Sequence, residues 1–183
     1  MKELSLNILD IAENSLKAKA TLTEILLNED EEALTITIRD NGTGMKKEMC
    51  ERVVDPFCTS RKTRKVGLGI PFFKLSAEQT GGSFKIESRF FEDFPENHGT
   101  EVSAKYNKKH IDFTPLGDVT ETIVTLIQGH PDTDIYFSHA RNGNSVKLDT
   151  RELREELGED ISLSEIEILC WIRDYLNEQY INL

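Results

Sequence analysis

Asp40 ends a predicted strand and begins the turn Asp40-Asn41-Gly42-Thr43-Gly44. A carboxylate held beside exposed main chain can accept a hydrogen bond from an amino group. Two glycines so close together let the backbone turn tightly and leave room for a flat ring to lie against it. An ordinary loop can have the same composition. The turn is therefore a candidate ligand site that needs support from other residues.

A basic run precedes a second glycine pair. Arg61, Lys62, Arg64 and Lys65 come just before Gly67-Leu68-Gly69, and a helix is predicted to begin there. A glycine turn at a helix N-terminus presents amide groups and the positive end of the helix dipole, and both favour phosphate. A solvated basic loop is the alternative for this run taken alone.

Asp10 and Asn14 stand four positions apart in an amphipathic segment, so they share one face of the predicted helix. Taken alone, the pair also fits the solvated side of any amphipathic helix.

The elements that must position these residues follow from apolar periodicity and from turn residues. Helical spacing covers Leu4 to about Lys19, a short helix is expected from Glu48 to Val54, and a third helix contains Pro71 and ends at Gly81-Gly82. Alternating patterns predict strands at 21–27, 34–39, 83–88 and 100–106.

The pattern changes after Asn107. Asp118 and Glu121 form a capping box for a helix that runs to Gln128. Asn142-Gly143 predicts a hairpin between strands at 134–139 and 145–149. A helix is expected at 150–157, and a last one is expected to be capped by Ser162 with Glu165 and to carry Trp171 as a core anchor.

Five motifs in this order resemble the four boxes of the GHKL superfamily, which includes the histidine kinases, gyrase B and the mismatch-repair ATPases. The resemblance covers about residues 3–107. It implies an α/β two-layer sandwich whose mixed sheet has helices on one face, followed by a small acidic α+β module at 108–183. The motifs are the helix with Asn14, the turn at Asp40, Asp55-Pro56-Phe57, Gly67-Leu68-Gly69-Ile70 and Gly99-Thr100.

The resemblance also implies roles for single residues, with ATP and Mg²⁺ as cofactors. Asn14 would hold the magnesium ion, and Asp10 would stand where several members place a catalytic glutamate. Asp40 would accept the adenine amino group and Gly44 would let the base pack closely, with Thr100 completing the pocket. Residues 58–65 would form a flexible lid over the triphosphate. The full set of nucleotide-binding candidates is Asn14, Asp40, Gly42, Gly44, Met45, Phe57, Arg61, Lys62, Arg64, Lys65, Gly67, Leu68, Gly69 and Thr100.

Within the superfamily, Pro56-Phe57-Cys58-Thr59-Ser60 and the second glycine box look most like the histidine-kinase catalytic domain. Glu13-Asn14-Ser15-Leu16 is similar to the mismatch-repair branch instead. No dimerisation helices or acceptor histidine precede the first helix, so a stand-alone catalytic domain is expected. Asp10 is one methylene shorter than glutamate, so the residues favour ATP binding over any particular phosphoryl transfer.

Charge and composition exclude several classes of protein. The net charge is −11, and residues 108–183 hold 7 basic against 15 acidic side chains. A nucleic-acid-binding surface needs a basic excess, so nucleic acid is not expected as the main partner. The apolar runs are too short to span a membrane, and the N-terminus lacks a signal peptide. The three cysteines have neither metal spacing nor a disulfide pattern, and the sequence predicts a cytoplasmic protein.

The combined prediction is a Mg-ATP-binding, histidine-kinase-like ATPase or kinase that acts on or regulates a protein partner in signal transduction. One alternative is a serine/threonine kinase similar to the anti-sigma factors that share this fold. A second alternative is a nucleotide-sensing module in which ATP orders the lid without turnover.

Overall fold

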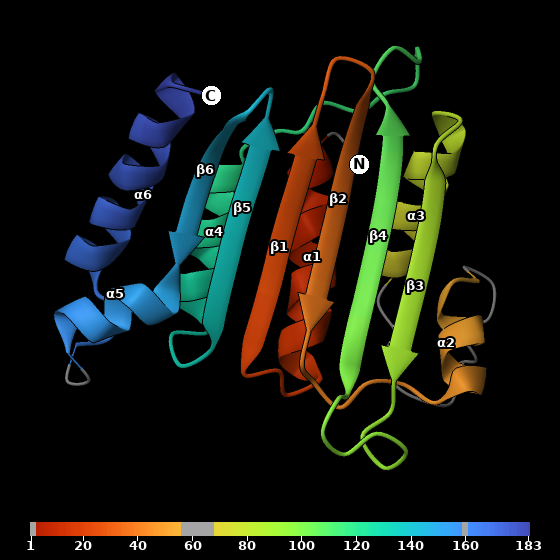
Figure 1. Cartoon of the computed structure of the whole chain (residues 1–183), viewed down its shortest axis with the longest axis horizontal. Coiled ribbons are helices and arrows are strands. Elements are labelled where there is room, and N and C mark those ends of the chain that lie inside the picture. Colours follow the sequence, from red (N-terminus) through yellow and green to blue (C-terminus); the bar gives the residue numbers. More distant parts are fainter. Residues whose placement is uncertain (1–2, 56–67, 159–160) are drawn as a thin grey trace.

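The computed structural model describes residues 3–55, 68–158 and 161–183 of the chain. Within these residues one six-stranded sheet has the strand order β3-β4-β2-β1-β5-β6, and β1 and β5 are its parallel pair (Figure 1). The elements in chain order are α1 (Leu4–Lys17), β1 (Leu22–Glu29), β2 (Ala33–Asp40), α2 (Lys47–Val53), α3 (Gly69–Gln79), β3 (Ser83–Arg89), β4 (Gly99–Asn107), α4 (Val119–Gly129), β5 (Asp134–Arg141), β6 (Asn144–Asp149), α5 (Thr150–Leu157) and α6 (Ile166–Ile181).

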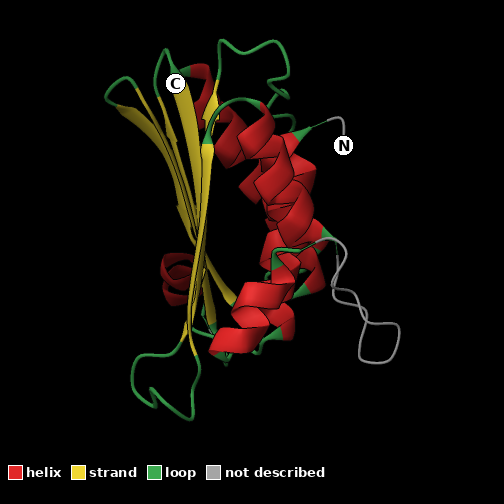
Figure 2. Cartoon of the chain, turned by 90° about the vertical axis from the view of Figure 1, so that its right-hand side faces the viewer, coloured by secondary structure: helices red, strands yellow, loops and turns green. Residues whose placement is uncertain are grey.

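Helices α1, α3 and α4 lie side by side on one face of the sheet, as the sequence predicts (Figure 2). The strands alternate accordingly: β1 and β2 bury every second side chain and leave the others half-buried or exposed. Because side chains of a strand alternate between the two faces, this pattern directs the apolar set toward the helices. Wherever the sequence analysis gave a first or last residue for α1, α3, α4, β1 or β2, the observed end lies within two residues of it.

Residues after 107 extend the same sheet. Strand β5 pairs with β1 in parallel over eight residues, and β6 returns antiparallel to β5. The predicted hairpin turn is confirmed, with Asn142 at φ 49° and Gly143 at φ 89°, as a turn with two left-handed residues requires. The boundary predicted at residue 107 therefore lies between two segments of one sheet.

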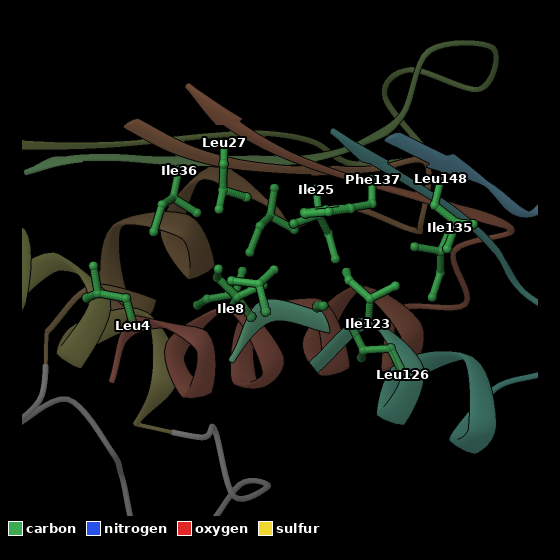
Figure 3. Close-up of a cluster of buried hydrophobic side chains, with 14 of the residues drawn as sticks. Leu4, Ile8, Ile25, Leu27, Ile36, Ile123, Leu126, Ile135, Phe137 and Leu148 are labelled. Atoms are coloured by element: carbon green, nitrogen blue, oxygen red, sulfur yellow. The ribbon is translucent and has the colours of Figure 1, made fainter. Parts of the chain in front are cut away.

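The hydrophobic core runs without interruption through both segments. Leu4, Ile8 and Ile123 project from the helices toward the sheet, and Ile25 and Phe137 project from neighbouring strands toward the helices, as Figure 3 shows. Each of these five side chains is fully buried.

A buried histidine joins the second segment to the first. His139 of β5 contacts Glu29 Oε2 through Nε2 at 3.0 Å and the Tyr180 hydroxyl through Nδ1 at 3.1 Å. An ionised Glu29 can only accept, so Nε2 carries the proton and Nδ1 accepts from Tyr180. Lys108 Nζ completes the cluster with a 2.5 Å contact to Glu29 Oε1.

This cluster predicts a loss of stability in mild acid. Burial lowers the pKa of His139 below its ordinary 6.5, and the contact with Glu29 offsets only part of that effect. Below about pH 6.5 the side chain of His139 binds a proton more readily in the unfolded chain than in the folded protein. The free energy of unfolding therefore falls as the pH falls. Urea titrations at about pH 7.5 and 5.5 should show this fall, and His139→Gln should reduce it. His110→Gln, at a more exposed histidine, should keep the wild-type pH dependence, and an unchanged dependence in His139→Gln would refute the assignment.

Two sequence predictions for the last helix are wrong. The N-cap of α6 is Glu165, and it makes no side-chain capping bond; Ser162 contacts Ser164 instead. Trp171 is not a core anchor, because 49% of its surface is exposed. Helical periodicity places Trp171 one position outside the buried stripe of Leu169, Ile172 and Leu176, and large aromatic residues tolerate that position.

Candidate functional site

Four polar side chains form one row across the end of the sheet. The register pairs Thr23 with Asp40, Asp40 with Thr100, and Thr100 with Ser88, across β1, β2, β4 and β3. Each lies two positions before or after a core-facing residue of its own strand, so all four side chains face the helices. The row therefore extends the hydrophobic core by one polar layer.

Asp40 is the most constrained residue of this row. Its Oδ1 accepts from the amides of Gly42 at 2.9 Å and Thr100 at 3.3 Å, and its Oδ2 accepts from Ser15 Oγ of α1 at 2.7 Å. A carboxylate oxygen has two acceptor positions, so Oδ2 retains one for another donor. The carboxylate is thus fixed in orientation while part of its surface stays exposed.

Ser88 and Thr100 hold the loop that follows β2. Their hydroxyls lie 2.8 Å apart, and Ser88 Oγ also accepts from the Met45 amide at 2.7 Å. Thr23 differs from the others: its hydroxyl is buried and has no hydrogen-bond partner among the described residues. An unpaired buried hydroxyl is costly, and a ligand group or a water at this end of the row would satisfy it.

His98 also contacts the loop that follows β2. Its Nδ1 lies 2.6 Å from the Gly42 carbonyl oxygen, so Nδ1 carries the proton and donates. At Gly44, which has φ 64°, an added methyl group would come within 1.9 Å of the Arg89 carbonyl oxygen. The turn therefore needs glycine at position 44 for its backbone conformation and for close packing against β3.

We expect Gly44→Ala to lower the free energy of unfolding by about 2–3 kcal/mol, because it combines an unfavourable φ with a backbone clash. Gly81 is the matched control: it also has a positive φ, 73°, but an added methyl group would meet nothing within 4 Å. Gly81→Ala should therefore cost only about 1 kcal/mol, the backbone penalty alone. Urea unfolding measures both variants, and equal losses would show that the packing at Gly44 is unimportant.

The predicted phosphate end of the site lies along α1. Asp10 is exposed and Asn14 half-buried on the same face of this helix, and no hydrogen bond of either side chain to another described residue is present. Gly69 begins α3 directly beside them, since an added methyl group there would lie 3.0 Å from Asp10 Cβ. The first amides of α3 are therefore close to the carboxylate of Asp10.

The structure brings together most of the described candidates. Asp40, Gly42, Met45 and Thr100 share one hydrogen-bonded network with Gly44 between them, and Asp10 adjoins Gly69. Leu68 is the exposed N-cap of α3. The candidates Phe57, Arg61, Lys62, Arg64, Lys65 and Gly67, and the lid at 58–65, lie outside the described residues.

Sequence reasoning missed Ser15, Thr23, Ser88 and His98. Thr23 and Ser88 carried a usable signal, because each is the polar residue at one end of a core-facing alternation: Thr23 begins that of β1 and Ser88 ends that of β3. Ser15 follows Asn14 directly, and its role needs the distance to Asp40. His98 lies between two predicted strands, and nothing in its neighbourhood along the chain indicates its contact with Gly42.

Comparison with known proteins identifies this arrangement. The profile of the family described as "Histidine kinase-, DNA gyrase B-, and HSP90-like ATPase" matches residues 2–110, more than half of the chain. The chain belongs to this family. It is 34% identical over 102 residues to the DNA mismatch repair protein MutL of Aquifex aeolicus, which covers 52% of this chain and 23% of that protein. It is 28% identical over 109 residues to sporulation kinase A of Bacillus subtilis, with 60% and 17% covered.

A solved structure extends the similarity beyond the family match. The Aquifex aeolicus MutL ATPase domain complexed with ADP superposes with a TM-score of 0.56 at 22% identity, covering 86% of this chain and 68% of the other. The shared fold therefore includes part of the segment after residue 110, and the predicted fold class is confirmed. The chain spans less than a quarter of the length of the two curated relatives.

Proposed function

We propose that this chain binds ATP with Mg²⁺ at the polar row and along α1, and that it acts on or regulates a protein partner. The observation that carries the proposal is the fixed carboxylate of Asp40, which keeps one acceptor position on Oδ2. An adenine amino group fits that position, and the orphaned Thr23 hydroxyl offers a second polar contact. ADP in the MutL ATPase domain supports the nucleotide class, since that protein shares the fold.

The residues at the other end fit a magnesium triphosphate. Asn14 supplies an amide oxygen, one of the hard oxygen ligands that Mg²⁺ prefers. The N-terminus of α3 at Gly69 supplies amides for phosphate oxygens. A bound magnesium ion would neutralise charge on the phosphates, and phosphoryl transfer depends mainly on such neutralisation and on positioning. Among the described residues, no group of three or more His, Cys, Asp or Glu side chains suits a metal.

Turnover separates the enzyme from the sensor. Similarity to sporulation kinase A favours a kinase, and Asp10 is then the catalytic candidate for activating the attacking group. An anti-sigma-like serine/threonine kinase would use the same residues. A nucleotide sensor without turnover would use Asp40 and Asn14 but not Asp10. Within the described ranges no helix combines the length and apolarity needed to cross a bilayer.

We also propose a cytoplasmic signalling role, which rests on the similarity to sporulation kinase A and on the expectation from the sequence.

Asn14→Ala tests the magnesium assignment. It should abolish the gain in ATP affinity that Mg²⁺ gives and stop any magnesium-dependent release of phosphate, while ADP without metal binds as before. Calorimetry with and without Mg²⁺ measures the first effect and labelled ATP the second. Asn28→Ala, at an exposed asparagine of β1, is the control and should behave as wild type. If Asn14→Ala keeps the full effect of Mg²⁺, the ion is held elsewhere.

Labelled ATP and cell extract then test the kinase candidates. A label on the partner that is lost in acid indicates phosphohistidine, and an acid-stable label indicates phosphoserine or phosphothreonine. Release of phosphate without any labelled protein would favour an ATPase, and neither product would favour the sensor.

A further inference from the structure

Helix α6 has an aromatic and acidic outer face. Trp171 and Tyr175 lie one turn apart, and their rings stack with centroids 5.0 Å apart and planes 11° apart. They are 49% and 38% exposed, whereas Leu169, Ile172 and Leu176 on the opposite side of the helix are buried. Helical spacing places three exposed acids beside the stack. We call these five residues, Glu167, Trp171, Asp174, Tyr175 and Glu178, the α6 outer face.

The carboxylates of the α6 outer face pair with no cation among the residues that the structure describes. None of the ion pairs within residues 3–55, 68–158 and 161–183 includes Glu167, Asp174 or Glu178. Arg173 is the one basic residue of α6, and its guanidinium contacts both carboxylate oxygens of Glu121 in α4. The face therefore offers aromatic surface and negative charge together.

The helix beneath this face is held on two sides. Gln179 bonds the amide and carbonyl of Lys147 at 2.9 and 3.0 Å, which attaches α6 to the edge strand β6. Arg173 and the buried leucine and isoleucine side chains attach it to α4 and the core. A surface fixed in this way loses little conformational entropy when a partner binds.

We propose that the α6 outer face is a docking site for a cationic amphipathic helix of a partner protein. Tryptophan and tyrosine are the residues that most often carry the binding energy of interfaces. Arginine or lysine of the partner would lie over the stacked rings and pair with the adjacent carboxylates, which combines cation–π and ionic contacts. Anionic lipid would be repelled by the same carboxylates. The site is independent of the nucleotide site, so this proposal does not rest on the proposed function.

The test uses a fluorescently labelled synthetic helix with leucine and arginine on one face, without nucleotide. Binding should be saturable, should change the emission of Trp171, which is the single tryptophan of the chain, and should weaken as salt is added. The double variant Trp171→Ala, Tyr175→Ala should weaken binding by about tenfold or more, as measured by peptide anisotropy. The triple variant Glu167→Gln, Asp174→Asn, Glu178→Gln should also bind more weakly and show less dependence on salt.

Matched substitutions elsewhere provide the controls. Phe94→Ala removes an aromatic ring that is 50% exposed in the β3–β4 loop, and Glu31→Gln, Glu48→Gln, Glu51→Gln removes three exposed acids; both should bind the peptide as wild type does. The proposal is overturned if the peptide does not bind or if a scrambled peptide of the same composition binds as well. It is also overturned if control and test variants lose affinity equally. A dimer in sedimentation that Trp171→Ala, Tyr175→Ala dissociates would assign the face to a second copy of this chain instead.

Discussion

Asp40→Asn should weaken ATP binding by about 10- to 150-fold, which corresponds to about 1.5–3 kcal/mol. The asparagine carbonyl can keep the two amide bonds that Oδ1 accepts from Gly42 and Thr100. Its amide group then replaces Oδ2 beside Ser15, whose hydroxyl can rotate and accept. The local fold is therefore preserved, but a donor now faces the adenine amino group where the carboxylate offered an acceptor.

Asp30→Asn is the matched control for this prediction. Asp30 Oδ1 also accepts two backbone amides, from Glu32 at 2.8 Å and Ala33 at 2.7 Å, in the β1–β2 turn at the far end of the strands. These amides hold the pKa of Asp30 below its ordinary value. Calorimetry should find wild-type ATP affinity in Asp30→Asn. Wild-type affinity in Asp40→Asn as well would remove Asp40 from the nucleotide site.

Short sequence motifs correctly predicted those turns and helix caps whose contacts involve only residues close together in the chain. The Asn142-Gly143 hairpin and the Asp118 cap, whose carboxylate accepts from the Glu121 amide at 2.9 Å, both need only a few consecutive residues. The turn at Asp40 indicates a candidate ligand site by itself, and the resemblance adds Thr100 to that site. Their actual relationship is a register pair between strands sixty positions apart, which no local pattern specifies.

The predictions that failed are those in which a local pattern competes with tertiary contacts. Ser162 and Glu165 have capping-box spacing, but α6 begins only after Glu165, where packing of Leu169 on the core sets its position. Trp171 has the residue type of a core anchor, but the burial of Ile172 next to it turns the indole ring outward. The parallel pairing of β5 with β1 is a different case: it links residues more than a hundred positions apart, and no local pattern specifies a pairing over that separation.

Phe137→Ala should destabilise the whole described sheet by about 3–5 kcal/mol, the cost typical of removing a buried aromatic side chain. Phe137 is fully buried and pairs in register with Ile25 of β1, so its ring fills space shared by residues before and after position 107. Because the core is continuous across that position, we expect one cooperative unfolding transition rather than two.

Two probes that report on different segments test this cooperativity. Trp171 fluorescence follows the segment after residue 107 in urea, and amide hydrogen exchange follows β2 and β4 in the segment before it. In Phe137→Ala both probes should report the same decrease in the free energy of unfolding. Ile111→Ala, at a side chain that is 94% exposed, should leave the free energy that each probe reports unchanged. If β2 and β4 kept wild-type protection while the Trp171 transition moved to lower urea, residues 1–107 and 108–183 would be separate folding units. Equal losses would show that the residues before and after position 107 unfold as one unit around the shared core.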